Sequence, residues 1–285
     1  MAQWQLSSNT LTKTMNDRIA FVGGGNMASA LIAGLIKGGL PNQQIDVLEL
    51  SADARERVRQ HYSVATHERP GAFLSSARVT VWAIKPQHFK DAALQIRFFA
   101  RESLHLSVAA GIRSDSIAHW LGSERVVRAM PNTPALIGKG ITALYARLGV
   151  TPDDQYQVEH IVGNTGDFLW LGHEEQLDAV TALSGSGPAY VYYFMEAMTA
   201  AGAQMGLSRE HAYRLAVATF IGASELAKAS NEPPEILRQR VTSKGGTTAA
   251  AIASMEASEV RTHFVSALHA AAHRAKEMGD EFGAH

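Results

Sequence analysis

The feature that most constrains the fold is an apolar run that enters a glycine-rich turn and then an amphipathic helix. Residues Ile19–Gly23 have the β-branched and apolar character of a buried strand. The next residues, Gly23–Ala28, fit the pattern Gly-x-Gly-x-x-Ala, and Met27, Leu31 and Leu35 continue at helical spacing. A strand, a glycine turn and a helix in this order are typical of the first unit of a parallel α/β sheet.

The same alternation continues through the first 171 residues. Short β-branched runs predict strands, with a further short one at 63–66, over these ranges: Ile19–Gly23, Ile45–Leu50, Arg78–Ile84, Leu104–Ala109, Val126–Ala129, Ile141–Tyr145 and Asp167–Leu171. The stretches between them predict helices at Met27–Lys37, Asp53–His61, Phe89–Phe99, Ser114–Leu121 and Asp153–Val162. This order predicts an α/β Rossmann-like domain with a doubly wound parallel sheet.

After Gly172 the composition changes, and no further strand is predicted. Alanine-, methionine- and leucine-rich segments predict helices at Ala189–Met205, Arg209–Ala229, Pro234–Val241, Thr247–Glu256 and Glu259–Gly279. We therefore predict a leader at 1–15, which we expect to be disordered, a dinucleotide-binding domain at 16–174 and an all-α domain at 175–285. The apolar content of these helices exceeds what a thin helical layer buries alone, which favours packing against a second copy over a compact monomeric bundle.

Composition excludes several functional classes. The chain has 285 residues, a formal net charge of -1 and no cysteine. Near-neutral charge does not favour nucleic acid or a membrane surface, and the missing thiols exclude disulfides and cysteine-ligated metals. No apolar run reaches the length of a membrane span, the leader lacks the features of a targeting signal, and the 12 histidines lack zinc-like spacing. We expect a cytoplasmic protein without a metal site.

The glycine turn predicts a dinucleotide site. Gly23 permits the tight turn, Gly25 allows the backbone to approach a pyrophosphate, and the helix that begins near Asn26 and Met27 directs N–H groups at the anion. Gly24 lies between them in the same loop. The alternative is a glycine-rich turn without a ligand.

Glu49 ends the second predicted strand, where an acidic residue binds the adenine ribose. A carboxylate here favours NADH, and we expect NADH to be used at least as well as NADPH. Arg55 and Arg57 follow within two helical turns and could offset the repulsion of a 2′-phosphate. The alternative is a solvent-facing strand end.

Two proline-containing loops follow predicted strands, at the edge where open α/β sheets bind ligands. The first contains Ala83, Lys85 and Pro86, and the second contains Asn132 within Met130–Pro134. We predict that they shape a nicotinamide pocket. Either loop could also be a plain turn.

A second anion site is predicted at Ser243-Lys244-Gly245-Gly246-Thr247-Thr248. Two glycines free the backbone to direct N–H groups at a ligand, and the threonines open an alanine-rich helix. The alternative is an ordinary helix start after a glycine turn.

Together these motifs resemble the Δ1-pyrroline-5-carboxylate reductase family, and the resemblance extends from Ile19 to Met278. The segments that carry it are Val22–Ala28, Ala83–Gln87, Ser107–Gly111, Arg128–Pro134, Ser184–Tyr190 and Thr242–Thr248. Two residues depart from the pattern: Glu49 stands where many relatives have a neutral residue, and Trp82 where smaller aliphatic residues are usual.

The resemblance implies a Rossmann domain and a helical dimerisation domain. It implies hydride transfer from NADPH or NADH to the C5 imine carbon of pyrroline-5-carboxylate, which gives proline, and a homodimer that assembles into larger rings in some relatives. It also implies that Ser243 and the N–H groups of Gly245, Gly246 and Thr247 hold the substrate carboxylate. Thr248 is then the group next to the ring nitrogen and the candidate catalytic residue. Ser184–Pro188 either lines the substrate pocket or only turns the chain.

Two other functions remain open from the residues alone. A β-hydroxyacid or other imine reductase also joins a Rossmann domain to helices, although Lys228, Lys244 and Lys276 lie in no matching catalytic motif. A nucleotide-sensing protein would bind the cofactor without turnover.

Overall fold

The computed structural model describes residues 18–283, so the predicted leader at 1–15 lies outside the described residues. The chain forms two compact units. The first contains residues 18–177 and 277–283, and the second contains 178–276. The boundary thus lies three residues after the predicted one. The last residues, which we placed in the helical domain, belong instead to the first unit.

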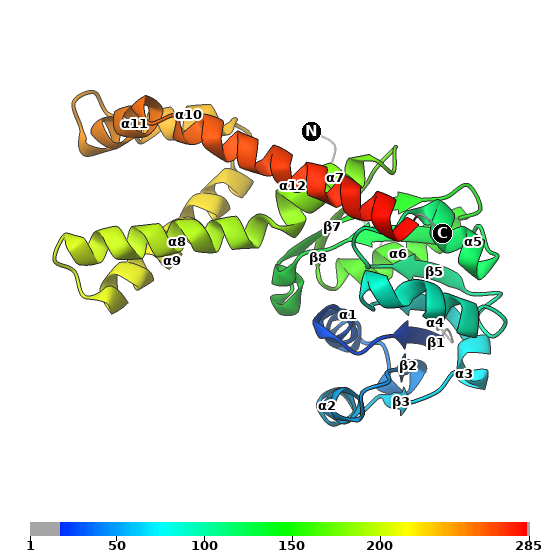
Figure 1. The fold of residues 1–285 in the computed structure, drawn as a ribbon. Coiled ribbons are helices and arrows are strands. Elements are labelled where there is room, and N and C mark those ends of the chain that lie inside the picture. The colour runs from blue at the N-terminus through cyan, green and yellow to red at the C-terminus, as the bar shows by residue number, and fades with distance from the viewer. Residues whose placement is uncertain (1–17, 284–285) are drawn as a thin grey trace. The chain divides into compact units, whose positions relative to one another are not determined.

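An eight-stranded sheet forms the centre of the first unit (Figure 1), with strand order β3-β2-β1-β4-β5-β6-β7-β8. The strands are β1 (Arg18–Val22), β2 (Ile45–Leu48), β3 (Ala65–His67), β4 (Ala77–Trp82), β5 (Leu104–Ser107), β6 (Val126–Met130), β7 (Gly140–Ala146) and β8 (Gly166–Trp170). All eight predicted strands are present. The order reverses direction at β1, so the glycine turn that follows β1 lies at the switch point where such sheets bind ligands.

The sheet is parallel, as predicted, except at one junction. β6 and β7 pair antiparallel, with Met130 opposite Ala143 and Val127 opposite Ala146, whereas β7 and β8 are parallel. The connection between β6 and β7 contains only a 3₁₀ turn, η3 (Thr133–Ile137). A parallel crossover requires a dozen or more residues, so a connection this short returns the chain in the opposite direction.

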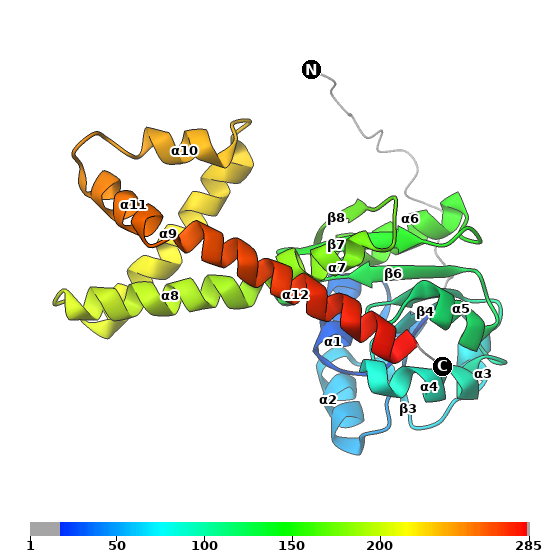
Figure 2. The ribbon, with the colours of Figure 1, turned by 45° about the horizontal axis from the view of Figure 1, so that its top comes forward.

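Helices cover both faces of the sheet (Figure 2). They are α1 (Asn26–Lys37), α2 (Ala52–Tyr62), α3 (Ala72–Ser75), α4 (Phe89–Ile96), α5 (Ser114–Leu121) and α6 (Pro152–Gly163). One core cluster joins α1 and α6 to the sheet, and a second joins α4 and α5 to the opposite face. Alternate strand residues enter the two clusters, as Phe21 and Val22 do, which is the two-residue period of a strand.

The C-terminal end of the last helix, α12 (Val260–Gly283), belongs to the first unit. Phe282 packs against the core cluster of α4 and α5, and the Arg113 guanidinium pairs with Asp280. Gly111 lies so close to Met278 that an added Cβ would be 2.9 Å from the Met278 Cβ. The sequence pattern predicted this helix but not its packing partner, because helical periodicity does not identify what a face packs against.

A buried aromatic group lies below the loop that follows β4. Trp82 is fully buried and stacks on Phe89, with ring centroids 4.6 Å apart. Its indole Nε1–H donates to His105 Nδ1 at 3.2 Å, so the His105 proton resides on Nε2. Burial, and secondarily the charge of Arg125, lowers the pKa of His105 to about 3. The Trp82 departure noted in the sequence is therefore matched by a neutral buried histidine.

We predict that His105 makes the protein less stable in acid. The unfolded chain binds a proton at His105 below pH 6.5, whereas the folded chain stays neutral down to about pH 3. The contribution of His105 to the free energy of unfolding is therefore fully present above pH 6.5. It falls below pH 6.5 by up to about 1.4 kcal/mol per pH unit. Urea unfolding at several pH values between 7 and 5 measures this slope. The variant His105→Gln should flatten it, and His119→Gln, at an exposed position of α5, should not. Equal slopes in wild type and His105→Gln would contradict the assignment.

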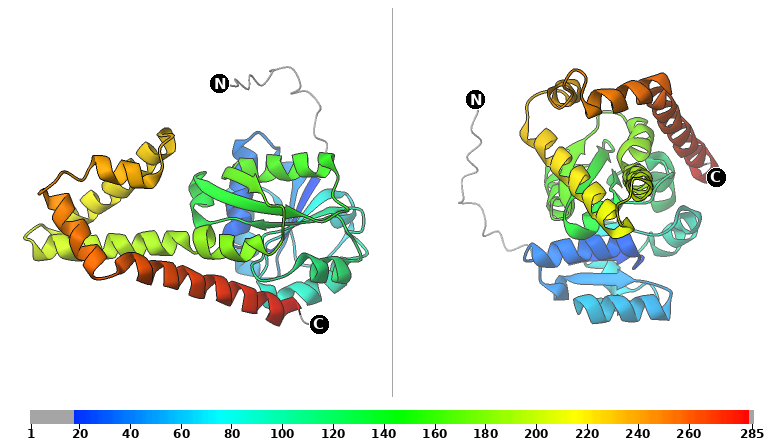
Figure 3. Two further views of the ribbon diagram at one scale, coloured as in Figure 1. Left: turned by 90° about the horizontal axis from the view of Figure 1, so that it is seen from above. Right: turned by 90° about the vertical axis from the view of Figure 1, so that its left-hand side faces the viewer.

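The second unit is helical throughout (Figure 3). Its elements are the end of α7 (Gln176–Val180), a π-helical turn η4 (Thr181–Gly185), α8 (Gly187–Gln204), α9 (Arg209–Ala229), α10 (Pro234–Arg240), α11 (Thr247–Ala257) and most of α12. All five predicted helices are present. α8 and α9 approach closely because their contact residues are small: a Cβ on Gly202 would lie 2.7 Å from the Ala212 Cβ. Among the described residues, no helix has the length and apolarity that crossing a membrane requires.

Much of the apolar surface of the second unit is exposed. Large side chains that are more than half exposed are Leu183, Tyr192, Tyr193, Met205, Tyr213, Leu215, Ile221, Leu226, Val241 and Met255. α9 buries only Ala212 and Ala216. A helical layer that leaves this many apolar side chains in water is typical of a surface that another protein chain covers.

Candidate functional site

The glycine turn adopts the geometry that the sequence predicted. Gly23 has a φ of 99°, and its N–H donates to Leu48 O at 2.8 Å. A Cβ at Gly23 would lie 2.5 Å from the Ala83 carbonyl oxygen. Only glycine therefore fits here, both for its φ and for the space, and its presence brings the turn after β1 against the loop after β4.

The start of α1 has the properties of an anion site. Gly25 is the N-cap residue, no side chain caps the helix, and its first turn contains no acidic residue. Nothing lies within 4 Å of a Cβ placed on Gly25, and Gly25 and Asn26 are exposed. The first N–H groups of a twelve-residue helix therefore point into open space, with the positive end of the helix dipole behind them. These residues fit a dinucleotide pyrophosphate.

Glu49, predicted to bind the adenine ribose, lies directly beside this loop. Its Oε2 accepts a hydrogen bond from the Gly24 N–H at 2.8 Å, and its Oε1 accepts one from the Ser51 N–H at 2.8 Å. The carboxylate is thus held between the glycine turn and the start of α2. A carboxylate has about four acceptor positions, so two remain for a ribose hydroxyl.

An ion pair between Arg55 and Glu68, which was not predicted from the sequence, lies next to Glu49. The Arg55 guanidinium donates from Nη1 to the carbonyl oxygens of Glu49 and Leu50, at 2.8 and 2.7 Å. Its Nη2 lies 3.4 Å from Glu68 Oε2. Glu68 directly follows β3, which pairs with β2, so strand order was the signal that could have placed it there.

The two proline loops lie along the same edge. Ala83 N–H donates to Val22 O at 2.9 Å, which fixes the start of the loop that contains Lys85 and Pro86. Asn132 Oδ1 accepts from the Ile141 N–H at 3.0 Å, so this side chain holds the β6–β7 connection. η3 in that connection also packs against α1. The first unit therefore brings together every residue predicted to bind the cofactor.

The loop predicted to bind the substrate, Ser243–Thr248, lies in the second unit, at the start of α11. Gly245 has a φ of 75°, and the Gly246 N–H donates to Ser243 O at 3.1 Å. Gly246 is the N-cap residue of α11 and supplies no side-chain cap. The first-turn N–H groups at Thr247 and Thr248 therefore lack the usual capping partner, which is the arrangement of an anion site.

The turn before α11 is compact around Gly246. Its N–H donates to Ser243 O within the turn. A Cβ on Gly246 would lie 2.6 Å from Ser243 Oγ, so glycine is the residue that this turn accommodates. The predicted clamp residues Ser243, Gly245, Gly246, Thr247 and Thr248 therefore lie within one tight turn and the start of α11.

The Ser184–Pro188 motif connects the π-helical turn at Thr181–Gly185 to the start of α8. The Ser186 N–H donates to Thr181 O at 2.8 Å, five residues earlier. Pro188 lies in the first turn of α8, where its missing N–H costs nothing. Single π-helical turns are rare and often accompany functional sites, which agrees with a role beyond turning the chain.

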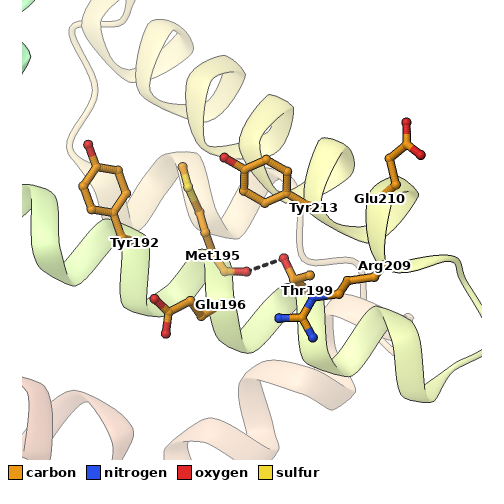
Figure 4. A pocket seen from close by; sticks show the side chains of 7 residues that line it. All are labelled: Tyr192, Met195, Glu196, Thr199, Arg209, Glu210 and Tyr213. Atoms are coloured by element: carbon orange, nitrogen blue, oxygen red, sulfur yellow. Dashed lines mark hydrogen bonds between the residues drawn. The ribbon is translucent and has the colours of Figure 1, made fainter.

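A pocket of about 580 Å³ opens between α8 and α9 (Figure 4). It is lined by Tyr192, Met195, Glu196, Thr199, Arg209, Glu210 and Tyr213. Within it the Thr199 hydroxyl donates to Met195 O at 2.7 Å. None of the predicted site residues lines it, and it belongs to the exposed apolar surface of the second unit.

A partly buried ionic network, which was not predicted from the sequence, is centred on Glu174. Arg128, on β6, donates from Nη1 to Glu174 Oε1 at 2.6 Å, and only 8% of Arg128 is exposed. Glu174 also accepts from the Ser114 N–H and hydroxyl, at 2.6 and 2.5 Å. One carboxylate therefore stabilises the start of α5 and an arginine from 46 residues away. Among the described residues there is no group of metal-ligating side chains.

Comparison with known proteins covers both units. Residues 174–278 match the family model "Pyrroline-5-carboxylate reductase dimerisation", and residues 18–111 match "NADP oxidoreductase coenzyme F420-dependent". The chain is 42% identical over 268 residues to the pyrroline-5-carboxylate reductase of Pseudomonas aeruginosa, which covers 93% of this chain and 98% of that one.

Solved structures of pyrroline-5-carboxylate reductases are also similar to this chain. A pyrroline-5-carboxylate reductase of Coxiella burnetii has a TM-score of 0.86 at 38% identity, with 92% of this chain and 98% of that chain covered. The pyrroline carboxylate reductase of Plasmodium falciparum, solved with NADP bound, has a TM-score of 0.84 at 29% identity, with 93% and 98% covered. The glycine turn, the helix-start site before α11 and this similarity along both units lead to one conclusion: the chain belongs to the pyrroline-5-carboxylate reductase family.

Proposed function

We propose that this protein reduces Δ1-pyrroline-5-carboxylate to L-proline with NAD(P)H, the last step of proline biosynthesis. Membership of the family along both units carries the proposal. The glycine turn with Glu49 supports a reduced nicotinamide dinucleotide, and the start of α11 supports a small carboxylate.

One group of residues binds the cofactor and another binds the substrate. Gly23–Met27, Glu49 and the loops of Ala83–Pro86 and Asn132 would hold NAD(P)H, which would supply the hydride. Ser243 and the N–H groups of Gly245, Gly246 and Thr247 hold the substrate carboxylate, and each such charge-assisted bond contributes about 1.5–3 kcal/mol. Binding in a fixed position provides much of the rate acceleration, because it replaces an encounter in solution by an oriented pair.

Proton delivery is assigned to the neighbourhood of Thr248. The substrate C=N carbon gains a hydride and the nitrogen gains a proton, so one proton must reach the ring nitrogen. A hydroxyl at the start of α11 can relay it from water or can only orient an imine that enters already protonated.

We predict that Thr248→Ala lowers kcat more than it raises KM for pyrroline-5-carboxylate. If the hydroxyl relays the proton, the loss in kcat is on the order of 100-fold. Steady-state kinetics with saturating cofactor measures both constants. Thr248→Ser, which keeps a hydroxyl, should recover most of the rate. An unchanged kcat in Thr248→Ala would reject the relay and leave an orienting role.

The function itself is tested by substrate choice. We expect oxidation of NADH and NADPH in the presence of pyrroline-5-carboxylate, with proline as product, and no comparable turnover with β-hydroxyacids. Cofactor binding without turnover would favour the nucleotide-sensing alternative. Faster turnover of a hydroxyacid would favour the second dehydrogenase class.

The protein self-associates through its helical unit. The exposed apolar side chains of α8 and α9 and the match to a dimerisation domain support this. We further propose a homodimer as the basic assembly, capable of forming larger rings, in the cytoplasm, where biosynthetic reductants and amino acids are used. Mass measurement in solution by light scattering tests the stoichiometry.

A further inference from the structure

The β2–α2 turn carries two carboxylates and one guanidinium in a fixed arrangement. Glu49 is held by the Gly24 and Ser51 N–H groups, both at 2.8 Å. Arg55 is held by the carbonyl oxygens of Glu49 and Leu50, at 2.8 and 2.7 Å. Its other terminal nitrogen, Nη2, lies 3.4 Å from Glu68 Oε2. The three side chains together carry a net negative charge at the edge where a Rossmann sheet binds the adenine ribose.

Each carboxylate has a separate effect on the ribose site. Glu49 presents acceptor positions, which suit a 2′-hydroxyl donor and repel a 2′-phosphate. Arg55 is the cation whose guanidinium could bind that phosphate, and arginine is well suited to such binding. Its Nη1 already donates to two carbonyl oxygens, and the group that faces Nη2 is Glu68.

We propose that Glu49 and Glu68 together select NADH over NADPH, with Glu68 acting through Arg55. This proposal rests on the proposed function for the identity of the cofactor. Glu49 is the residue that binds the ribose. Glu68 is a positioning residue, because its carboxylate holds Nη2 and cancels the charge that a 2′-phosphate would need.

The Glu68–Arg55 pair can be tested by substitution because the Glu68 side chain is exposed. The Glu68 side chain is 63% exposed, whereas that of Arg55 is 19% exposed. Removing the Glu68 charge therefore leaves the fold intact and leaves Arg55 in place, held by the turn carbonyls. Glu56, which pairs with Arg59 on the outer surface of α2, offers a matched loss of one negative charge that does not touch Arg55.

The first experiment measures binding without turnover. The Kd values of 5′-ADP and of its 2′-phosphorylated form, 2′,5′-ADP, are compared by calorimetry on wild type, Glu68→Gln and Glu56→Gln. We expect wild type to bind 5′-ADP at least as tightly as 2′,5′-ADP. Glu68→Gln should shift the ratio toward 2′,5′-ADP by about threefold to fivefold, the range that an exposed ion pair can supply. Glu56→Gln should leave the ratio near that of wild type. In Glu68→Gln/Arg55→Ala the shift should disappear, because the gain acts through Arg55.

The second experiment measures kcat/KM for NADH and NADPH with pyrroline-5-carboxylate. We expect wild type to use NADH at least as well as NADPH, Glu49→Gln to lower the NADH value and raise the NADPH value, and the KM for pyrroline-5-carboxylate to stay constant. A preference for NADPH of about 100-fold in wild type, or an unchanged ligand ratio in Glu68→Gln, would overturn the proposal. Failure of turnover with both cofactors while the binding ratios shift as expected would instead contradict the proposed function alone.

Discussion

Replacing Gly23 by alanine will nearly abolish use of the cofactor. The φ of 99° is costly for any residue with a Cβ, and that Cβ would lie 2.5 Å from Ala83 O and 2.7 Å from Ile84 Cγ2. The turn after β1 and the loop after β4 must then separate, and displacement by about 1 Å at a positioning element lowers activity about 100-fold. We expect at least this loss in kcat/KM for both NADH and NADPH.

Gly39→Ala is the matched control for this prediction. Gly39 has a φ of 97°, close to that of Gly23, but nothing lies within 4 Å of a Cβ placed there. The control therefore introduces the same backbone strain, about 1–2 kcal/mol, without a collision at the site. We expect a lower Tm with an unchanged cofactor KM. A Gly23→Ala enzyme with a cofactor KM within about twofold of wild type would show that the close approach of the two loops is not required.

The second large effect is a loss of stability in Glu174→Ala. This change leaves Arg128, of which only 8% is exposed, without its carboxylate, and removes the acceptor from the start of α5. Breaking a fully buried ion pair by removing one partner costs about 3–5 kcal/mol, and we expect a loss near the lower end because the Glu174 side chain is 19% exposed. We expect the unfolding transition of the first unit to move to correspondingly lower urea concentration, followed by tryptophan fluorescence.

A surface pair in the same region provides the comparison. Glu124 pairs with Arg147 at 2.7 Å, and its side chain is 63% exposed. Exposed pairs of this kind contribute about 0–1 kcal/mol, so Glu124→Ala should have a small effect. Equal losses in the two variants would mean that burial of Arg128 does not set the cost. Substituting both Glu174 and Arg128 by apolar residues should recover part of the stability, since no buried charge then remains unpaired.

Local chemistry accounts for the features that could be predicted from the chain. Strands and helices recur where apolar residues follow a period of 2 or 3.6, and α5 and α9 begin and end at the predicted residues. The short α3 and the π-helical turn at Thr181–Gly185 were not predicted, because four or five residues contain too little of a period to recognise.

In the candidate site, local sequence patterns likewise indicated some residues, whereas others depend on tertiary contacts. Gly23, Gly25 and Glu49 could be identified because each is required by a local geometry: a positive φ, an approach to the helix start, or a strand end. The hydrogen bond from the Gly246 N–H to Ser243 O could not be predicted, because it depends on the conformation of one turn. Glu68 was missed because only strand pairing brings it to Arg55.

The sequence by itself determined the class of fold, the two candidate anion-binding segments and the resemblance to one reductase family, because these depend on short-range periodicity and on glycine at fixed spacings. Only the tertiary structure decided the antiparallel return of β7, the packing of residues 277–283 on the first unit, and the partners of Glu174 and Glu68. These depend on contacts between residues that are distant in the chain, and no local sequence pattern encodes which charged side chains form a pair.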